Sequence, residues 1–124
     1  MKIRKGVERM TTKIMISRPM KGKTKEDIDK DTNEMANLLF DYYGDDNIEI
    51  MASIVENHIK KSELECLSES IFFMSQSDIL AMGFGWENSR GCKLEHEIAK
   101  AYNLPVVYLD NIKEELDISQ EVVM

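Results

Sequence analysis

A short basic segment near the start of the chain could bind an anion. It reads Ser17-Arg18-Pro19-Met20-Lys21-Gly22-Lys23-Thr24 and places three cations and a hydroxyl directly before a predicted helix. A helix N-terminus offers free amide N–H groups and the positive end of the helix dipole, so a phosphate or carboxylate could bind there. We therefore predict ligand-binding roles for Ser17, Arg18, Met20, Lys21, Gly22 and Lys23. A solvated basic loop is the alternative.

The same segment comes within one residue of a P-loop, because Gly22-Lys23-Thr24 fits the end of that motif. Ser17 stands where the motif has its first glycine, and Pro19 removes one of the amide donors that cradle a phosphate. Residues 106–110 could serve as the strand that holds Mg²⁺. The match lacks its full context, so a P-loop phosphotransferase is our third hypothesis for the function.

A second loop, residues 83–91, is punctuated by glycines that permit close approach of the backbone to a ligand. We include Gly85 and Gly91 as candidate ligand-binding residues. Trp86, the only tryptophan, could stack on a planar base or could cap the hydrophobic core. Arg90 could bind a phosphate or pair with one of the many acidic residues.

Glu95 is the candidate catalytic residue. We expect it in the first turn of a helix that starts near Cys92, where the helix dipole favours the ionised carboxylate. An ionised carboxylate suits a nucleophile or the stabilisation of an oxocarbenium ion. A solvated surface Glu beside Glu97 is the alternative. We expect His96 to be exposed, and because nothing nearby has metal-ligand spacing we predict neither a metal nor a cofactor.

Strand and helix patterns alternate along the body of the chain. Apolar runs predict strands at 13–17, 48–55, 79–82 and 106–109, and helical periodicity predicts helices over 24–43, 62–74 and 92–102. The inward stripes of the last two helices are Leu64, Leu67, Ile71 and Met74, and Leu94, Ile98 and Ala101. A short helix from Asn111 and a further strand at 118–123 complete the prediction.

This alternation predicts an α/β fold, a flavodoxin-like three-layer sandwich with a four- to five-stranded parallel sheet. In a flavodoxin-like strand order the first and third strands are neighbours, which would place the loops 17–24 and 83–91 side by side at the carboxyl edge of the sheet. Asp78 opens the third strand at the opposite edge, and we interpret it as structural. The function should therefore be sought where the two loops meet.

Length and charge limit the function classes. The chain has 124 residues and a net charge of −7, but residues 1–23 carry eight Lys and Arg against one acid. We treat residues 1–12 as a basic tail or edge segment and residues 13–124 as one domain. The acidic body argues against nucleic-acid binding. No apolar run is long enough for a membrane helix, no leader pattern is present, and two cysteines indicate a reducing, cytoplasmic setting.

Four segments carry a resemblance to a known family: the two loops, the run from Met74 to Asp78, and the run Glu95-His96-Glu97-Ile98-Ala99. The chain resembles a small family of the nucleoside 2-deoxyribosyltransferase-like superfamily, and the members of this small family are often encoded by phages and prophages. The resemblance covers residues 13–109. It implies a flavodoxin-like fold, a homo-oligomer, and a Glu95 that attacks the anomeric carbon of a sugar. It also implies that residues 17–23 contact the sugar or its 5′-phosphate.

One position departs from the pattern of that superfamily. Its transferases and nucleotide hydrolases carry an Asp eight residues before the acid that opens the strand, where this chain has Ser70 before Asp78. A hydroxyl is a poor general acid near neutral pH. We therefore carry two main hypotheses: an N-glycosidase or deoxyribosyltransferase acting on a nucleotide or nucleoside through Glu95, and a non-catalytic module that binds a nucleotide or another small phosphorylated ligand, with Ser70 in its site.

Overall fold

The computed structural model describes residues 11–51 and 61–123, and the side chains within them up to residue 119. The described elements alternate between strand and helix, as predicted. In chain order they are β2 (Thr12–Ser17), α1 (Lys25–Tyr43), β3 (Ile48–Met51), α2 (Glu63–Ser75), β4 (Ile79–Met82), the 3-10 turn η1 (Trp86–Asn88), α3 (Arg90–Ala101), β5 (Val106–Tyr108) and α4 (Leu109–Val123).

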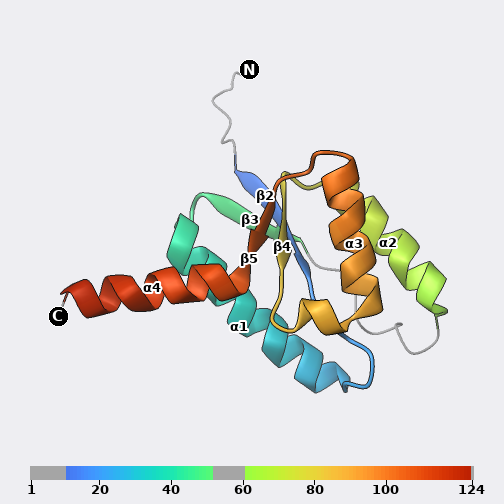
Figure 1. The fold of residues 1–124 in the computed structure, drawn as a ribbon, viewed down its shortest axis with the longest axis horizontal. Helices are drawn as coiled ribbons and strands as arrows, with labels where there is room; N and C mark the ends of the chain where they lie inside the picture. Colours follow the sequence, from blue (N-terminus) through green and yellow to red (C-terminus); the bar gives the residue numbers. More distant parts are fainter. Residues whose placement is uncertain (1–10, 52–60, 124) are drawn as a thin grey trace.

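The described strands form one parallel sheet of four strands in the order β3-β2-β4-β5 (Figure 1). Met15 of β2 pairs with Met51 of β3 on one side and with Leu80 of β4 on the other. The first and third predicted strands are thus neighbours, and the predicted α/β, flavodoxin-like arrangement is confirmed. Residues 52–55, which we predicted to continue the second strand, lie outside the described residues.

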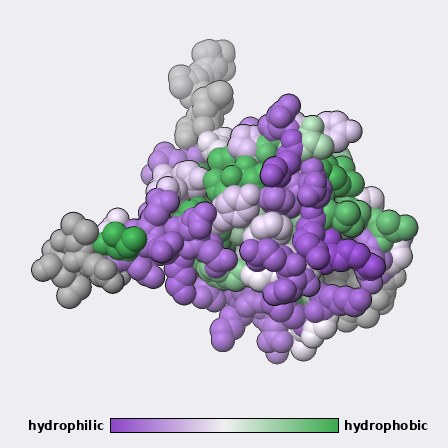
Figure 2. All heavy atoms as spheres, viewed as in Figure 1, coloured by the Kyte–Doolittle hydropathy of each residue, from purple (hydrophilic) through white to green (hydrophobic). Residues whose placement is uncertain are grey.

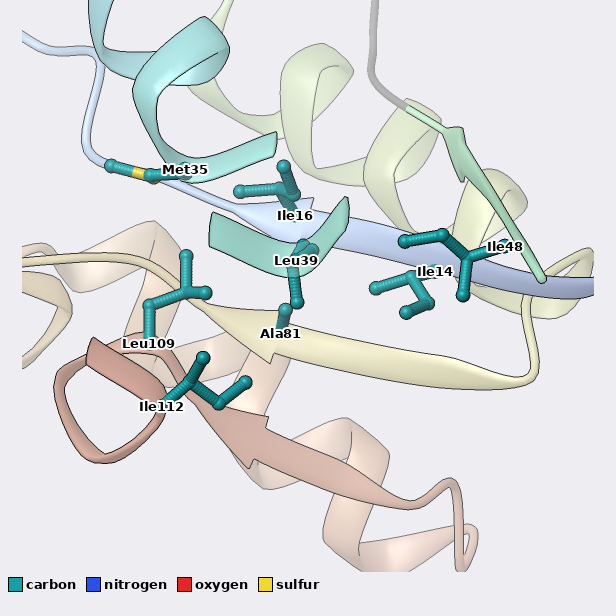
Figure 3. Packing of buried hydrophobic residues seen from close by; sticks show 8 residues of the cluster. All are labelled: Ile14, Ile16, Met35, Leu39, Ile48, Ala81, Leu109 and Ile112. Atoms are coloured by element: carbon teal, nitrogen blue, oxygen red, sulfur yellow. The ribbon is translucent and has the colours of Figure 1, made fainter. Parts of the chain in front are cut away.

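Two helices cover each face of the sheet, which gives the three layers. On one face α1 and α4 pack against alternate residues of β2 and β4, and Figure 3 shows this cluster closing around Ile14, Ile16 and Ala81. On the other face α2 and α3 pack against Met15, Leu80 and Met82. Successive strand residues point to opposite faces, so a continuous apolar run supplies both layers of the core.

Local signals fix the helix ends near the sheet. Thr24 caps α1 by accepting a hydrogen bond from the Asp27 amide at 3.1 Å, and Gly44 ends that helix. Ser62 and Glu65 form a reciprocal capping box at the start of α2. At the edge opposite the predicted site, the Lys13 amide donates to the Asp78 carboxylate and the Asp78 amide to the Lys13 carbonyl. Asp78 is therefore structural, as expected.

Two predictions for the C-terminal part were wrong. Leu109 is the first residue of α4 rather than the last of a strand, and residues 118–123 continue that helix instead of forming a strand. Leu109 and Ile112 are buried against the first core cluster, and Leu116 packs beside them. These residues are three and four positions apart, which places them on one face of a helix. In a strand, Leu109 and Ile112 would point to opposite faces of the sheet.

The inward stripes of α2 and α3 also differ from prediction. Leu64 is 78% exposed, and Ile71 and Leu94 are exposed too, while Ser70 and Met74 are the buried residues of α2. Apolar side chains consequently reach the surface on the side of the molecule where α2 and α3 lie (Figure 2). No helix among the described residues is long and apolar enough to cross a membrane.

Candidate functional site

The ends of β2 and β4 bring the two predicted loops together. The Gly83 amide donates to the Ser17 carbonyl at 2.8 Å, directly after the last paired residues of the two strands. A Cβ at position 83 would lie 2.9 Å from that carbonyl oxygen and 2.8 Å from the Met35 sulfur. Glycine is therefore required for close packing of the two loop starts, rather than for approach to a ligand.

A cavity of about 590 Å³ lies beside this junction, between the loop after β2, helix α2 and the start of α3. Its size falls in the range of small-molecule sites. Eight of the predicted site residues line it: Arg18, Met20, Lys21, Gly22, Ser70, Arg90, Gly91 and Glu95. Ser17 reaches the same place through its bond to Glu95.

Glu95 is a buried carboxyl, only 8% exposed, and not a solvated surface residue. The Ser17 hydroxyl donates to its Oε1 at 2.5 Å. Burial raises the pKa of Glu95, while hydrogen bonds from the Ser17 and Ser70 hydroxyls and the charge of Arg18 act in the opposite direction. The side chain is thus oriented by two hydroxyls and costly to ionise.

The expected helix-dipole effect on Glu95 needs correction. Helix α3 begins at Arg90, with the Ser89 hydroxyl accepting from the Cys92 amide at 3.3 Å, so its start lies two residues before the predicted one. Glu95 therefore sits in the second turn, where the dipole has little influence. Desolvation, which the sequence pattern could not show, is the largest effect on this carboxyl.

Arg18 places a buried cation near Glu95. The residue is 8% exposed, and burial lowers the pKa of its guanidinium, while the carboxylates of Glu95 and Asp29 raise it. A guanidinium keeps its proton at any pH of interest. Arg18 therefore offers a fixed positive charge that favours ionised Glu95 and any anionic group entering the cavity.

Cys92 and Ser89 complete the inner wall of the cavity. Cys92 is 3% exposed, and burial raises the pKa of its thiol, while hydrogen bonds with Ser17 and Ser89 lower it. The Ser17 hydroxyl is thus shared between a carboxyl and a thiol. This arrangement favours a neutral thiol, which packs against the core and is a poor nucleophile.

Charged side chains from three segments meet at the mouth of the cavity. Glu63, the first residue of α2, forms ion pairs with Lys21 and with Arg90. Lys21 lies in a turn closed by a bond of 3.1 Å from the Lys23 amide to the Met20 carbonyl. Gly22 has φ +80° in this turn, a conformation that favours glycine.

Besides Ser17, three predicted site residues do not line the cavity. Lys23 pairs with Asp31 of α1 at 2.7 Å, and Gly85 precedes η1 in a left-handed conformation. Trp86 stacks on His96 with ring centroids 4.5 Å apart and packs beside the second core cluster. These contacts agree with a role for Trp86 in capping the core.

His96 is also placed differently from our expectation. It is half-buried rather than exposed, because its ring lies against Trp86 and its Nε2 is 2.7 Å from the Tyr108 hydroxyl. Among the residues that the structure describes, no three His, Cys, Asp or Glu side chains gather as a metal site would require.

Several residues of the cavity lining were not predicted from the sequence. Besides Cys92 they are Pro19, Lys61, Glu63, Cys66, Leu67, Asn88 and Ser89. Ser89 had a visible signal, because Ser is a favoured N-cap residue directly before a helix. Glu63 had none that separates it from an ordinary acid in the first turn of a helix.

The fold and the cavity together define an α/β protein with a cavity at the carboxyl edge of a parallel sheet, where ligands bind in many proteins of this class. Residues 12–108 match the family described as a domain of unknown function, DUF4406, and the chain belongs to that family. No curated protein and no solved structure matches the chain significantly.

Proposed function

We propose that the protein cleaves the N-glycosidic bond of a nucleotide or nucleoside, with Glu95 as the nucleophile. The observation that carries the proposal is a buried carboxyl held by the Ser17 hydroxyl at 2.5 Å in the lining of a cavity of about 590 Å³. A buried acid that is costly to ionise and faces a cavity is typical of a catalytic group. The resemblance to deoxyribosyltransferase-like proteins assigns the same residue to the same role.

In this mechanism the ionised carboxylate of Glu95 attacks the anomeric carbon of the sugar. The bond between that carbon and the base nitrogen breaks, its electron pair leaves with the base, and a glycosyl ester on Glu95 remains. Water, or the nitrogen of a second base, then attacks the same carbon and releases the carboxylate. Hydrolysis and base transfer differ only in this second acceptor.

The roles of the neighbouring groups follow from their charges. Arg18 favours the ionised form of Glu95, and the hydroxyls of Ser17 and Ser70 orient it. Four cationic residues line the cavity, namely Arg18, Lys21, Lys61 and Arg90, against the acids Glu63 and Glu95. This balance favours a phosphorylated substrate over a free nucleoside.

A second candidate, a module that binds a nucleotide or another small phosphorylated ligand without cleaving it, is favoured by one observation. The ion pairs with Arg90 and Lys21 lower the pKa of Glu63, so the other carboxyl of the lining is ionised and cannot protonate a leaving base. Ser70 stands where the superfamily pattern has an Asp. A catalytic protein would therefore need a base that leaves readily, with its proton taken from water.

The test is to incubate the protein with a panel of ribo- and deoxyribonucleosides and their 5′-monophosphates and to separate the products by chromatography. Release of a free base supports the catalytic proposal and names the substrate. Binding of a panel member to wild type and to Glu95→Gln alike, without any release, supports the binding module. A protein that neither binds nor cleaves any member of the panel would contradict both the catalytic proposal and the binding module.

We further propose a homo-oligomer in the cytoplasm. Large apolar side chains are exposed on α2 and α3 and directly after α3: Leu64, Ile71, Phe72, Leu94 and Tyr102. Both described cysteines are free, which fits a reducing compartment. Sedimentation equilibrium of wild type and Phe72→Ser tests the assembly. A monomeric wild type would contradict it.

A further inference from the structure

Glu63 joins two cations that come from different parts of the chain. Its Oε2 lies 3.5 Å from the Lys21 Nζ in the loop after β2, and its Oε1 is hydrogen-bonded to the Arg90 guanidinium at the start of α3. All three residues line the cavity. One carboxylate thus occupies the space between two cations at the mouth of the site.

These ion pairs are exposed. The side chains of Lys21, Glu63 and Arg90 are 86%, 63% and 73% exposed. Ion pairs in such contact with water contribute little, so a competing anion can replace the carboxylate at low cost. A phosphate monoester carries close to two negative charges near neutral pH and three acceptor oxygens, so it suits a lysine and a bidentate guanidinium better than one carboxylate does.

The position of Arg90 does not serve its own helix. It is the first residue of α3, and the first turn of that helix has no acidic residue to offset a cation at the positive end of the dipole. Glu63 supplies that negative charge from α2. Any anion that replaced Glu63 would have to supply it instead.

We propose that Glu63 occupies the anion subsite of the empty protein and that the phosphate of the ligand replaces it between Lys21 and Arg90. The proposal rests on the proposed function only in naming that ligand a nucleoside monophosphate, whose sugar would then extend toward Glu95. Glu63 would then be a specificity-determining residue, because phosphate must compete with its carboxylate for Lys21 and Arg90.

The experiment is a titration with inorganic phosphate at constant ionic strength, followed by the amide NMR signals of Gly22 and Gly91, which flank Lys21 and Arg90. Glu63→Gln removes the competing charge and should bind phosphate about three-fold more tightly. Glu115→Gln is the matched control, because it removes the same charge from α4, on the opposite face of the sheet. Equal or weaker binding by Glu63→Gln would overturn the proposal.

A second pair of variants separates the two lysines of the loop. Lys21→Ala should weaken phosphate binding several-fold, whereas Lys23→Ala should not, because Lys23 pairs with Asp31 and lies outside the cavity lining. Equal losses in both variants would contradict the subsite. Neither titration involves base release, so a protein without glycosidase activity can still pass them, and an active glycosidase can still fail them.

Discussion

Replacing Glu95 with Gln should stabilise the fold at neutral pH, and the gain should shrink as the pH falls. In the wild type the carboxyl group of Glu95 is buried beside Ser17, Ser70 and Arg18, and burial is the largest influence on its pKa and raises it. Glutamine keeps a carbonyl oxygen that can accept the Ser17 hydrogen bond but carries no charge to desolvate. A stabilising replacement is typical of a position kept for activity.

The sign and the steepness of this pH dependence of the stability difference follow from proton binding to Glu95. Because the folded-state pKa of Glu95 lies above its ordinary value of 4.5, the folded protein holds the proton more tightly than the unfolded chain. The wild type therefore loses stability relative to Glu95→Gln as the pH rises from near 4.5 through the raised pKa, and the difference is constant above it. One group can change the difference by at most about 1.4 kcal/mol per pH unit.

Urea unfolding followed by circular dichroism, at steps between pH 4 and pH 8, measures this difference. Glu97→Gln is the control, because Glu97 is an exposed residue of the same helix and its carboxylate is in water in both states. A free-energy difference between wild type and Glu95→Gln that does not change with pH would refute the reasoning. A difference that favours the wild type as the pH rises would show that Arg18 and the hydroxyls outweigh burial.

Two further predictions concern packing and catalysis. Gly83→Ala should lower the free energy of unfolding by about 1–3 kcal/mol in urea, because its Cβ would meet the Ser17 carbonyl at 2.9 Å, and a loss below about 0.5 kcal/mol would mean that the two strand ends separate freely. If base is released, kcat/KM should begin to fall on acidification at a pH above the pKa of an ordinary glutamate. The reason is that Glu95, whose pKa is raised, takes up a proton at that higher pH and is then no longer a nucleophile. A fall that begins only near pH 4.5 would contradict the burial argument.

Much of the fold was predictable because its signals are local. The continuous apolar run at Ile79–Met82 fits a strand buried on both faces, and the caps at Thr24 and Ser62 define helix starts that the structure confirms. The order of the strands followed from the alternation of strand and helix. The C-terminal helix was mispredicted because the apolar residues between Ile118 and Val123 fit two periods, and they continue a helix that starts at the buried residues Leu109 and Ile112.

The candidate site was predictable in place but not in its electrostatics. The topology brought the basic loop and Glu95 to one cavity, as expected from the adjacent strand ends. Whether a helical Glu is buried depends on what covers it, and Ser17 and Ser70 lie 78 and 25 positions away in the sequence. No short-range pattern reports such contacts, so the direction of the pKa shift was not predictable.

The partners of the cations were equally hidden from the sequence. Lys21 and Lys23 are two residues apart and look equivalent, but one faces Glu63 at the cavity mouth and the other pairs with Asp31 of α1. Trp86 stacks on His96, ten residues later, because η1 folds back over α3. In each case a tertiary contact assigns the side chain, and the residue type alone allowed both roles.

The most direct test of the central claim compares base release by Glu95→Gln and Glu97→Gln with that of the wild type, on whichever substrate the panel identifies. We expect Glu95→Gln to stay folded and to lose about a thousand-fold or more of the rate, while Glu97→Gln stays close to the wild type. A folded Glu95→Gln that releases base within a few-fold of the wild-type rate would show that Glu95 is not the nucleophile.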